Sequence, residues 1–279
     1  ADPLPSGQAR ILKVFLPFVV GASIAFVVAL PLAWKWELGM VRAAVAVGVC
    51  ALAAGAAVGL LDAVIGVGFT TALLLVAGLT LAFAGAAVLW RFYRDPERTS
   101  PDRHEVVVSP ADGQVIYVHG CQGGALPVST KNGRCYALDE LVRTRLRSDD
   151  AIVVGIALNF LDVHVNRAPI AGTISKLQRY PGRFASLKDP SAVFVNERST
   201  TVVERPDLQV AVVLIASRLV RRIVSHVREG DPVAMGQRIG AIRFGSQVDV
   251  VLPDEDVRVL VRPGQRVRAG ETVIAEVVR

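Results

Sequence analysis

The sequence predicts a set of N-terminal transmembrane α-helices followed by a mainly β globular domain of the barrel-sandwich type, with lipoyl-like repeats. The first observation is composition: 52% of the 279 residues are hydrophobic, and the mean hydropathy is +0.45. The second is that this excess lies between residues 11 and 90, while short Val/Ile runs fill the remainder. The third is a glycine repeat near the C-terminus. We therefore expect an anchor over residues 1–92 and one β-rich domain over residues 93–279, long enough for a core of its own.

The anchor contains three apolar runs, at residues 11–34, 41–61 and 63–90, with a short link at Asp62. Each run is long enough to cross a hydrocarbon layer of about 30 Å as a helix. Three spans are therefore predicted. The alternative is two spans, with one run re-entrant or paired as a tight hairpin.

The distribution of basic residues predicts the orientation. Three spans place the loop from Lys35 to Arg42 and the segment 91–98, which contains Arg91, Arg94 and Arg98, on one side. The positive-inside rule then puts the globular domain in the cytoplasm of a bacterial-type inner membrane, although Arg10 and Lys13 favour the opposite orientation. The net charge of +6 indicates an anionic bilayer surface as partner. Nucleic acid is not expected, because zinc-finger spacing and RNA-binding aromatic motifs are missing from the sequence.

After Pro101 the pattern changes to short β-type runs separated by Gly, Pro and Asp turns, as in sandwiches and barrels. Helix is expected only around residues 137–146 and in short connectors. The predicted strands are residues 105–109, 114–119, 152–158, 173–177, 200–203, 210–215, 239–244, 248–252 and 257–261.

An internal repeat supports the barrel-sandwich prediction. Residues 230–239 and 264–273 both read G-x-x-V-x-x-G-x-x-I/V, and residues 110–115 resemble residues 169–174. Similar repeats occur in lipoyl and biotinyl carrier domains, but a carrier needs a lysine at a hairpin tip, and the last lysine is Lys188. A non-catalytic, membrane-tethered adaptor with this fold remains an alternative.

The stretch 240–253, Gly-Ala-Ile-Arg-Phe-Gly-Ser-Gln-Val-Asp-Val-Val-Leu-Pro, is the most informative. Taken alone it reads as strand, turn and strand. It resembles the self-cleavage site of phosphatidylserine decarboxylases, and four other segments are similar to that family in the same order. These are Arg-Phe-Tyr-Arg-Asp-Pro-Glu-Arg at 91–98, Ser-Pro-Ala-Asp-Gly at 109–113, Asp-Val-His-Val-Asn-Arg-Ala-Pro at 162–169 and Asn-Glu-Arg at 196–198.

The resemblance implies that the chain is a self-processing proenzyme that makes its own pyruvoyl cofactor. The Ser246 hydroxyl attacks the Gly245 carbonyl, and cleavage between residues 245 and 246 leaves a large N-terminal chain bound to a small C-terminal chain. A pyruvoyl group at the new terminus then forms a Schiff base with phosphatidylserine and accepts electrons as CO₂ leaves, giving phosphatidylethanolamine. A serine phospholipid with ether-linked chains meets the same chemistry.

Such a serine needs a general base, and the base needs an orienting group. The resemblance assigns these roles to His164 and Asp112. The competing interpretations are a structural histidine in a strand and a plain Asp-Gly turn.

The resemblance further implies that Arg218, Arg221, Arg222 and Asn166 bind the substrate, since arginine forks suit phosphate. The alternative for the arginines is a solvated charged face. No metal site is expected, because no His/Cys/carboxylate cluster stands out. The family's tendency to self-associate is also implied.

Overall fold

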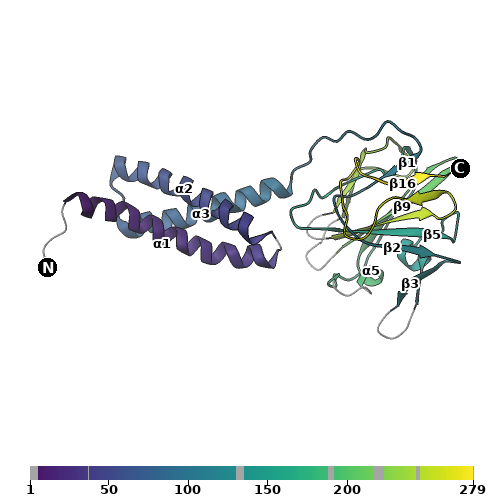
Figure 1. The fold of residues 1–279 in the computed structure, drawn as a ribbon, viewed down its shortest axis with the longest axis horizontal. Helices are drawn as coiled ribbons and strands as arrows, with labels where there is room; N and C mark the ends of the chain where they lie inside the picture. The colour runs from purple at the N-terminus through teal and green to yellow at the C-terminus, as the bar shows by residue number, and fades with distance from the viewer. Residues whose placement is uncertain are drawn as a thin grey trace. The chain divides into compact units, whose positions relative to one another are not determined.

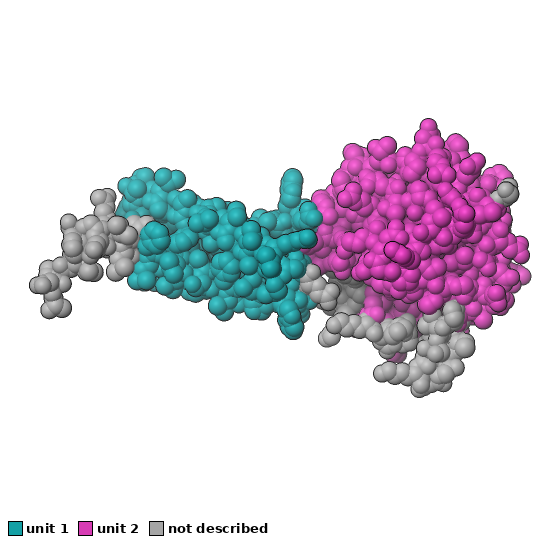
Figure 2. Space-filling model, viewed as in Figure 1, with its two compact units in different colours: residues 1–93 teal, residues 94–279 magenta. Residues whose placement is uncertain are grey.

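The computed structural model describes residues 6–36, 38–129, 135–187, 192–216, 223–242 and 246–278. Two compact units are found, Ala1–Tyr93 and Arg94–Arg279 (Figure 2). Each is described below by itself.

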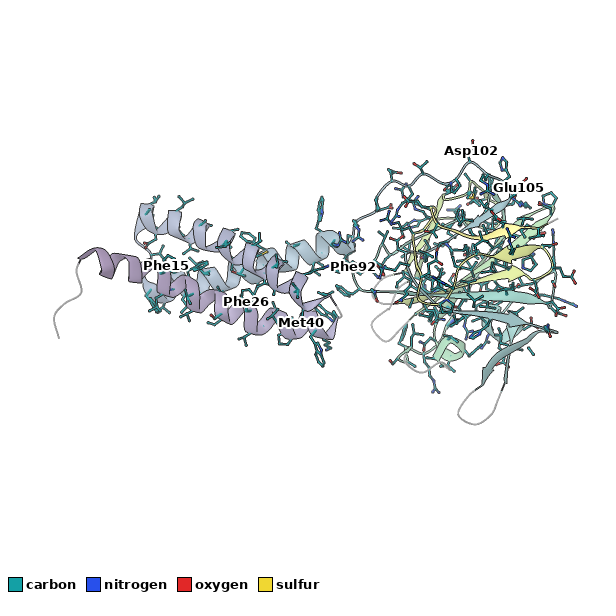
Figure 3. All side chains as sticks on the ribbon, in the orientation of Figure 1. Phe15, Phe26, Met40, Phe92, Asp102 and Glu105 are labelled. Atoms are coloured by element: carbon teal, nitrogen blue, oxygen red, sulfur yellow. The ribbon has the colours of Figure 1, made fainter. Side chains whose placement is uncertain are left out.

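The first unit consists of three helices, α1 (Ser6–Lys35), α2 (Met40–Ile65) and α3 (Phe69–Phe92), which pack against one another (Figure 1). Within the described residues, three helical stretches are long and apolar enough to cross a membrane: Phe15–Lys35, Met40–Ile65 and Phe69–Phe92. Large apolar side chains cover the outside of the helices, as at Phe15 and Val64, which are 62% and 81% exposed (Figure 3). Such an apolar exterior is suited to lipid and confirms the predicted membrane helices.

The predicted link at Asp62 is wrong. Helix α2 continues to Ile65, and Gly66 ends it in the left-handed conformation at φ +66°. The Asp62 carboxylate accepts a hydrogen bond from the Val67 N–H at 2.7 Å. A single carboxylate in the last turn therefore serves the helix end, and the chain reverses only where glycine permits positive φ.

The second unit is mainly β. Its short helices are α4 (Leu138–Val142) and α5 (Ala192–Val195). Its strands are β1 (Val106–Val108), β2 (Gly113–Cys121), β3 (Ala125–Ser129), β4 (Cys135–Ala137), β5 (Ala151–Leu158), β6 (Val165–Arg167), β7 (Gly172–Tyr180), β8 (Arg198–Arg205), β9 (Leu208–Ile215), β10 (Ile223–Ser225), β11 (Pro232–Val233), β12 (Arg238–Ile242), β13 (Ser246–Pro253), β14 (Val257–Val259), β15 (Arg266–Val267) and β16 (Val273–Val277).

An eight-stranded antiparallel sheet, in the order β11-β7-β8-β9-β13-β5-β2-β15, curls through this unit (Figure 1). Apolar clusters cover both of its faces. Strand alternation explains this, because Val250 of β13 belongs to one cluster and its neighbour Val251 to the other. The first cluster includes residues of the small sheets β1-β16-β14 and β10-β12-β6, and the second includes α4 and α5.

The predicted β class is confirmed, because each of the nine predicted runs overlaps a strand in its described part. The predicted helix is α4. Sequence reasoning missed β3, β4, β6, β10, β11, β15 and β16, all of which have only two to five residues.

The internal repeat has a structural counterpart. Strand β15 of one repeat pairs with the start of β2, and β11 of the other pairs with the start of β7. The Gly264 N–H donates to the Val115 carbonyl at 2.8 Å, and the Gly230 N–H donates to the Ile174 carbonyl at 2.8 Å. The sheet order therefore reads as two similar halves, β11-β7-β8-β9 and β13-β5-β2-β15, which meet at β9 and β13.

Candidate active site

The predicted catalytic segments converge on one end of β5. Ser246, the first residue of β13, pairs with Leu158, the last residue of β5. On the other side of β5, Ala157 pairs with Gln114 of β2, and Gln114 follows Asp112 by two residues. Neighbouring strands lie about 4.8 Å apart, so the backbones of β13 and β2 are within roughly 10 Å of each other here.

His164 reaches the same place through the connection that leaves β5. The chain turns at Asn159–Asp162, where the Asp162 N–H donates to the Asn159 carbonyl at 3.0 Å, and then enters β6. The His164 carbonyl accepts a hydrogen bond from the Ile242 N–H at 3.0 Å, at the end of β12. Ile242 precedes Ser246 by four residues, a span of at most about 14 Å along an extended chain. The backbones of His164 and Ser246 are thus held at the two ends of one short connection.

The His164 imidazole is buried, with 4% of the residue exposed. Burial lowers its pKa from the ordinary value of 6.5, while a hydrogen bond with the Asp162 backbone and the charge of Asp162 oppose the change. The charge of Arg94 lowers the pKa further, and that of Asp112 raises it. A histidine with a lowered pKa is neutral at neutral pH, which is the form that accepts a proton.

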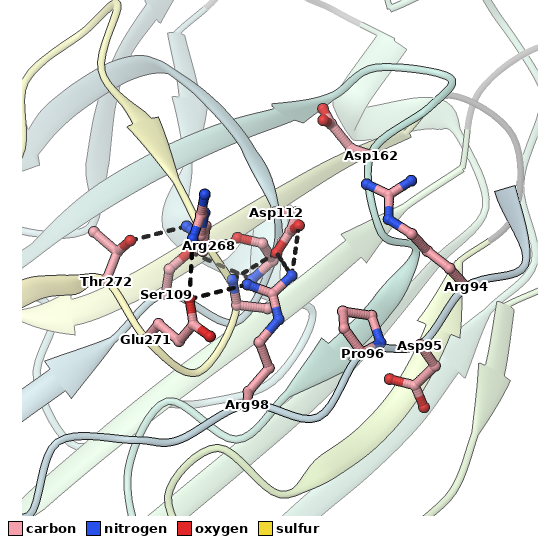
Figure 4. A network of polar contacts seen from close by, with 12 residues as sticks. Arg94, Asp95, Pro96, Arg98, Ser109, Asp112, Asp162, Arg268, Glu271 and Thr272 are labelled. Atoms are coloured by element: carbon pink, nitrogen blue, oxygen red, sulfur yellow. Dashed lines mark hydrogen bonds and ion pairs between the residues drawn. The ribbon is translucent and has the colours of Figure 1, made fainter. Parts of the chain in front are cut away.

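The Asp112 carboxylate is also buried, and it is held by an arginine from the segment that follows α3. Arg98 donates through Nη2 to both carboxylate oxygens, at 3.2 and 2.9 Å, and the Ala269 N–H donates to Oδ1 at 2.8 Å (Figure 4). An ionised carboxylate accepts about four hydrogen bonds, so these contacts leave capacity for another donor.

The internal repeat indicates that Asp112 is not required for its turn. Pro110, Asp112 and Gly113 correspond to Pro169, Ala171 and Gly172 in the other half. The equivalent chain reversal is therefore made with alanine in the place of the aspartate. A plain Asp-Gly turn leaves the buried Arg98 partner of Asp112 unexplained.

Sequence reasoning missed Asp162 and Arg98 as members of this site, although both lie in the quoted motifs. Asp162 is 8% exposed, its Oδ2 accepts from the Asn159 N–H at 2.8 Å, and Arg266 pairs with its Oδ1. The signal that could have found it is its position two residues before His164, on the same short connection.

Asn166 is fully buried, and its Nδ2 donates at 3.5 Å to the carbonyl of Pro110, two residues before Asp112. Its Oδ1 has no hydrogen-bond partner within the described part of the chain. A substrate-binding role stays a prediction. Gly245, Arg218, Arg221 and Arg222 lie outside the described residues, as does the side chain of Ser246.

The Asn196–Arg198 motif is a scaffold. Asn196 accepts from the Ala185 N–H at 2.7 Å and donates to the Ala185 and Ala216 carbonyls at 3.0 and 2.8 Å. Arg198 donates to the carbonyls of Glu140 and Phe194, near the ends of α4 and α5. Burial lowers the pKa of Arg198 to about 10. The motif therefore fixes Ala216, which directly precedes the segment containing the predicted phosphate-binding arginines.

Within the described residues, no group of three or more His, Cys, Asp or Glu side chains could hold a metal ion.

Known sequences were compared with the chain. The sequence model of the phosphatidylserine decarboxylase family matches residues 86–275, which include every segment converging on β5. The chain belongs to the phosphatidylserine decarboxylase family. It is therefore an enzyme of this family, which argues against a non-catalytic adaptor.

Several relatives carry names that agree with the family. Phosphatidylserine decarboxylase proenzymes of Erythrobacter litoralis and Novosphingobium aromaticivorans are each 42% identical, over 198 and 200 residues. These matches each cover 71% of this chain, and they cover 76% and 75% of the two relatives, respectively. A putative archaetidylserine decarboxylase proenzyme of Methanocaldococcus jannaschii is 39% identical over 184 residues, covering 66% of this chain and 87% of the relative.

Proposed function

We propose that this chain decarboxylates phosphatidylserine to phosphatidylethanolamine and CO₂, using a pyruvoyl group that it makes from Ser246. The observation that carries the proposal is the convergence of Ser246, His164 and Asp112 on one end of β5, in a chain of this family. The names of the relatives support the substrate class.

Self-cleavage begins with Ser246. Its hydroxyl attacks the Gly245 carbonyl carbon as His164 takes the hydroxyl proton, and the Gly–Ser peptide becomes an ester. Elimination of the Gly245 carboxylate leaves an unsaturated residue at position 246. Water then hydrolyses this residue, releases ammonia and leaves the pyruvoyl group at the new N-terminus. Asp112 and Asp162 orient His164 and stabilise the imidazolium it becomes.

The residues present fit a pyruvoyl group at position 246. That position is the first residue of a strand hydrogen-bonded on both sides, to β5 and β9, so strand pairing holds the new terminus after cleavage. When present, the pyruvoyl carbonyl supplies the electron sink for loss of CO₂ from an amino-acid head group. His164, buried and neutral, exchanges protons with the substrate beside it.

Intact-mass analysis of the purified chain tests the proposal. Two fragments separated between Gly245 and Ser246 are expected, with a carbonyl on the smaller one that reacts with hydroxylamine. Ser246→Ala should stay one chain and should release no CO₂ from phosphatidylserine vesicles. A folded wild-type chain that remains intact and still decarboxylates contradicts the proposal, and a non-catalytic adaptor predicts that Ser246→Ala is silent.

The pH dependence of cleavage tests the role of His164. Because burial lowers its pKa, the rate should hold down to a pH below 6.5 before it falls as the imidazole takes up a proton. His164→Ala should slow cleavage about 100-fold or more, within the range for loss of a general base. The rate is measured by pulse-labelling the chain in cell-free synthesis with liposomes. Wild-type processing by His164→Ala would show the assignment to be wrong.

The same proposal places the β unit on the cytoplasmic side of a bacterial-type inner membrane. Arg91 at the end of α3 and the adjoining Arg94 and Arg98 support this by the positive-inside rule. The expected partners are the phospholipid substrate, an anionic membrane surface, the chain's own C-terminal fragment and a second copy of the chain. A C-terminal topology reporter that is active only in the periplasm would contradict the orientation.

A further inference from the structure

The segment that follows α3 is bound tightly to the β unit. We call residues 94–98, Arg-Asp-Pro-Glu-Arg, the strap. Arg94 donates to the Leu161 carbonyl at 2.8 Å, just before Asp162, and Arg98 binds Asp112 (Figure 4). The two ends of the strap therefore contact the two segments that flank the candidate base.

The middle of the strap is fastened by arginines of the β unit. Arg167 donates to the Asp95 carboxylate at 3.2 Å and to the Pro96 carbonyl at 3.0 Å. Arg238 donates to Asp95 and, at 2.7 Å, to Glu97. These contacts fix the path of the strap, but they do not involve Asp112.

Arg98 differs from Arg167 and Arg238 because its partner is the Asp112 carboxylate of the candidate site. Only 8% of its side chain is exposed, and it donates to both oxygens of Asp112 while Nη1 donates to Glu271 at 3.2 Å. A planar guanidinium held by two carboxylates has little freedom to rotate. Its contact with both oxygens of Asp112 also restricts rotation of that carboxylate.

We infer that Arg98 is a positioning residue for self-cleavage. Its guanidinium fixes the Asp112 carboxylate in the arrangement from which Asp112 orients His164. The membrane-proximal strap is thus a component of the processing site. The inference rests on the proposed function, because it gives Arg98 a role only through Asp112 and His164.

The test follows cleavage of the full-length chain, pulse-labelled during cell-free synthesis with liposomes. Arg98→Ala is expected to slow cleavage about 10- to 100-fold, since a misplacement of about 1 Å can cost about 100-fold. Arg98→Lys keeps the charge but not the fork, and it should be slowed about 10-fold. The matched control is Arg238→Ala, which removes an arginine that binds the same strap at Asp95 and Glu97 without touching Asp112, and it should cleave within about 3-fold of wild type.

Melting temperatures of the variants separate positioning from loss of stability. Similar melting temperatures for Arg98→Ala and Arg238→Ala, with slow cleavage only in the first, support positioning. Cleavage rates that follow melting temperature across both variants overturn it. If Arg98→Ala does not fold, Arg98→Lys decides, and a wild-type rate in that variant overturns the inference.

Ser246→Ala in the same assay distinguishes the two levels of failure. An intact Ser246→Ala chain beside normally cleaved Arg98 variants rejects the positioning role and leaves the proposed function standing. Cleavage of Ser246→Ala itself rejects the proposed function.

Discussion

The two halves of the eight-stranded sheet share a backbone plan but not their chemistry. In both, a Gly-x-x-Val-x-x-Gly segment pairs with the start of a long strand, and the first glycine donates to that strand at 2.8 Å. The repeat glycines also share their conformation, with φ of +91° and +92° at Gly230 and Gly264 and of +77° and +74° at Gly236 and Gly270. The plan is therefore a requirement of the fold.

The halves differ in the residues at two pairs of equivalent positions, where one half carries a buried carboxylate and the other does not. The half with β2 and β13 carries Asp112 at its turn and Asp249 inside its central strand, both buried. The other half has Ala171 at the equivalent turn, and Val213 of β9 lies directly opposite Asp249. Buried carboxylates cost free energy that alanine and valine do not. The other half does bury one carboxylate, Glu197 directly before β8, but it is paired with Arg179 within the scaffold. The contrast therefore lies at the two equivalent positions, where only the half that contains Ser246 carries a carboxylate.

The largest expected effect comes from removing the carboxylate of the turn at Asp112. Asp112→Asn keeps the shape but loses the charge facing Arg98, so self-cleavage should slow about 100-fold or more, as when acid–base assistance is lost. The free energy of unfolding should fall by about 1–3 kcal/mol, because Arg98 loses a buried partner. Time-resolved intact mass measures the first effect, and chemical denaturation measures the second.

Ala171→Asp is the matched change in the other half. It places a carboxylate at the equivalent turn while leaving the contact between Arg98 and Asp112 unchanged, and cleavage should keep its wild-type rate. Equal slowing by both substitutions would mean that the turns act through stability alone, and the contrast between the halves would then carry no chemistry.

The next effect concerns Asp249, which is completely buried. Gln247 donates to its Oδ1 at 2.7 Å and also contacts the Tyr117 hydroxyl, while Oδ2 has no partner among the described residues. Burial raises the pKa of Asp249 to about 6, against about 3.9 in an unfolded chain. The folded state therefore holds this proton more tightly. Stability should fall by about 3 kcal/mol as the pH rises from about 4 through about 6.

Asp249→Asn should remove most of that pH dependence, measured as the free energy of unfolding at a series of pH values. Asp254→Asn is the control, since Asp254 lies just past the end of the same strand and is exposed, and it should leave the dependence in place. An Asp249→Asn chain with the wild-type slope would show that other groups set it.

Much of the fold was predictable because it is encoded locally. Apolar runs of sufficient length predict the membrane helices, and Val/Ile runs between turn residues predict the long strands. The link at Asp62 was misplaced because a lone charge interrupts an apolar run in sequence without interrupting the helix, which ends at Gly66. Strands such as β11 and β15 have two residues each, too short to show a period.

The candidate site was predictable only in part. The order of the motifs predicts His164, Asp112 and Ser246 as site residues. Strand pairing across β5 brings the segments of Asp112 and Ser246 together, and the bond from the Ile242 N–H holds His164 near them. The partner of Asp112 was not predictable, because the Arg98 contact depends on the path of the strap over the β unit. The Asn196–Arg198 motif has an internal role that depends on carbonyls distant in sequence, which no local pattern specifies.

The smallest expected effects are losses of stability when the glycines shared by the two halves are replaced. Gly230→Ala and Gly264→Ala should each cost about 1–2 kcal/mol from positive φ alone, since nothing lies within 4 Å of the added methyl group. Gly236→Ala should cost about 1 kcal/mol more, because its methyl would lie 1.9 Å from the Ser100 Oγ and would break the hydrogen bond to the Met235 carbonyl. Thermal melts of the three variants measure the order of their stability losses.

Ser100→Ala decides whether that difference has the assigned cause. In a Ser100→Ala background the 1.9 Å contact is removed and only the Cβ of residue 100, at 3.2 Å, stays close, so most of the excess cost of Gly236→Ala over Gly230→Ala should disappear. If the excess persists, the backbone around Gly236, where its counterpart Gly270 lies in contact, is the constraint. The close approach of the two repeats would then restrict residue 236 more than the Ser100 side chain does.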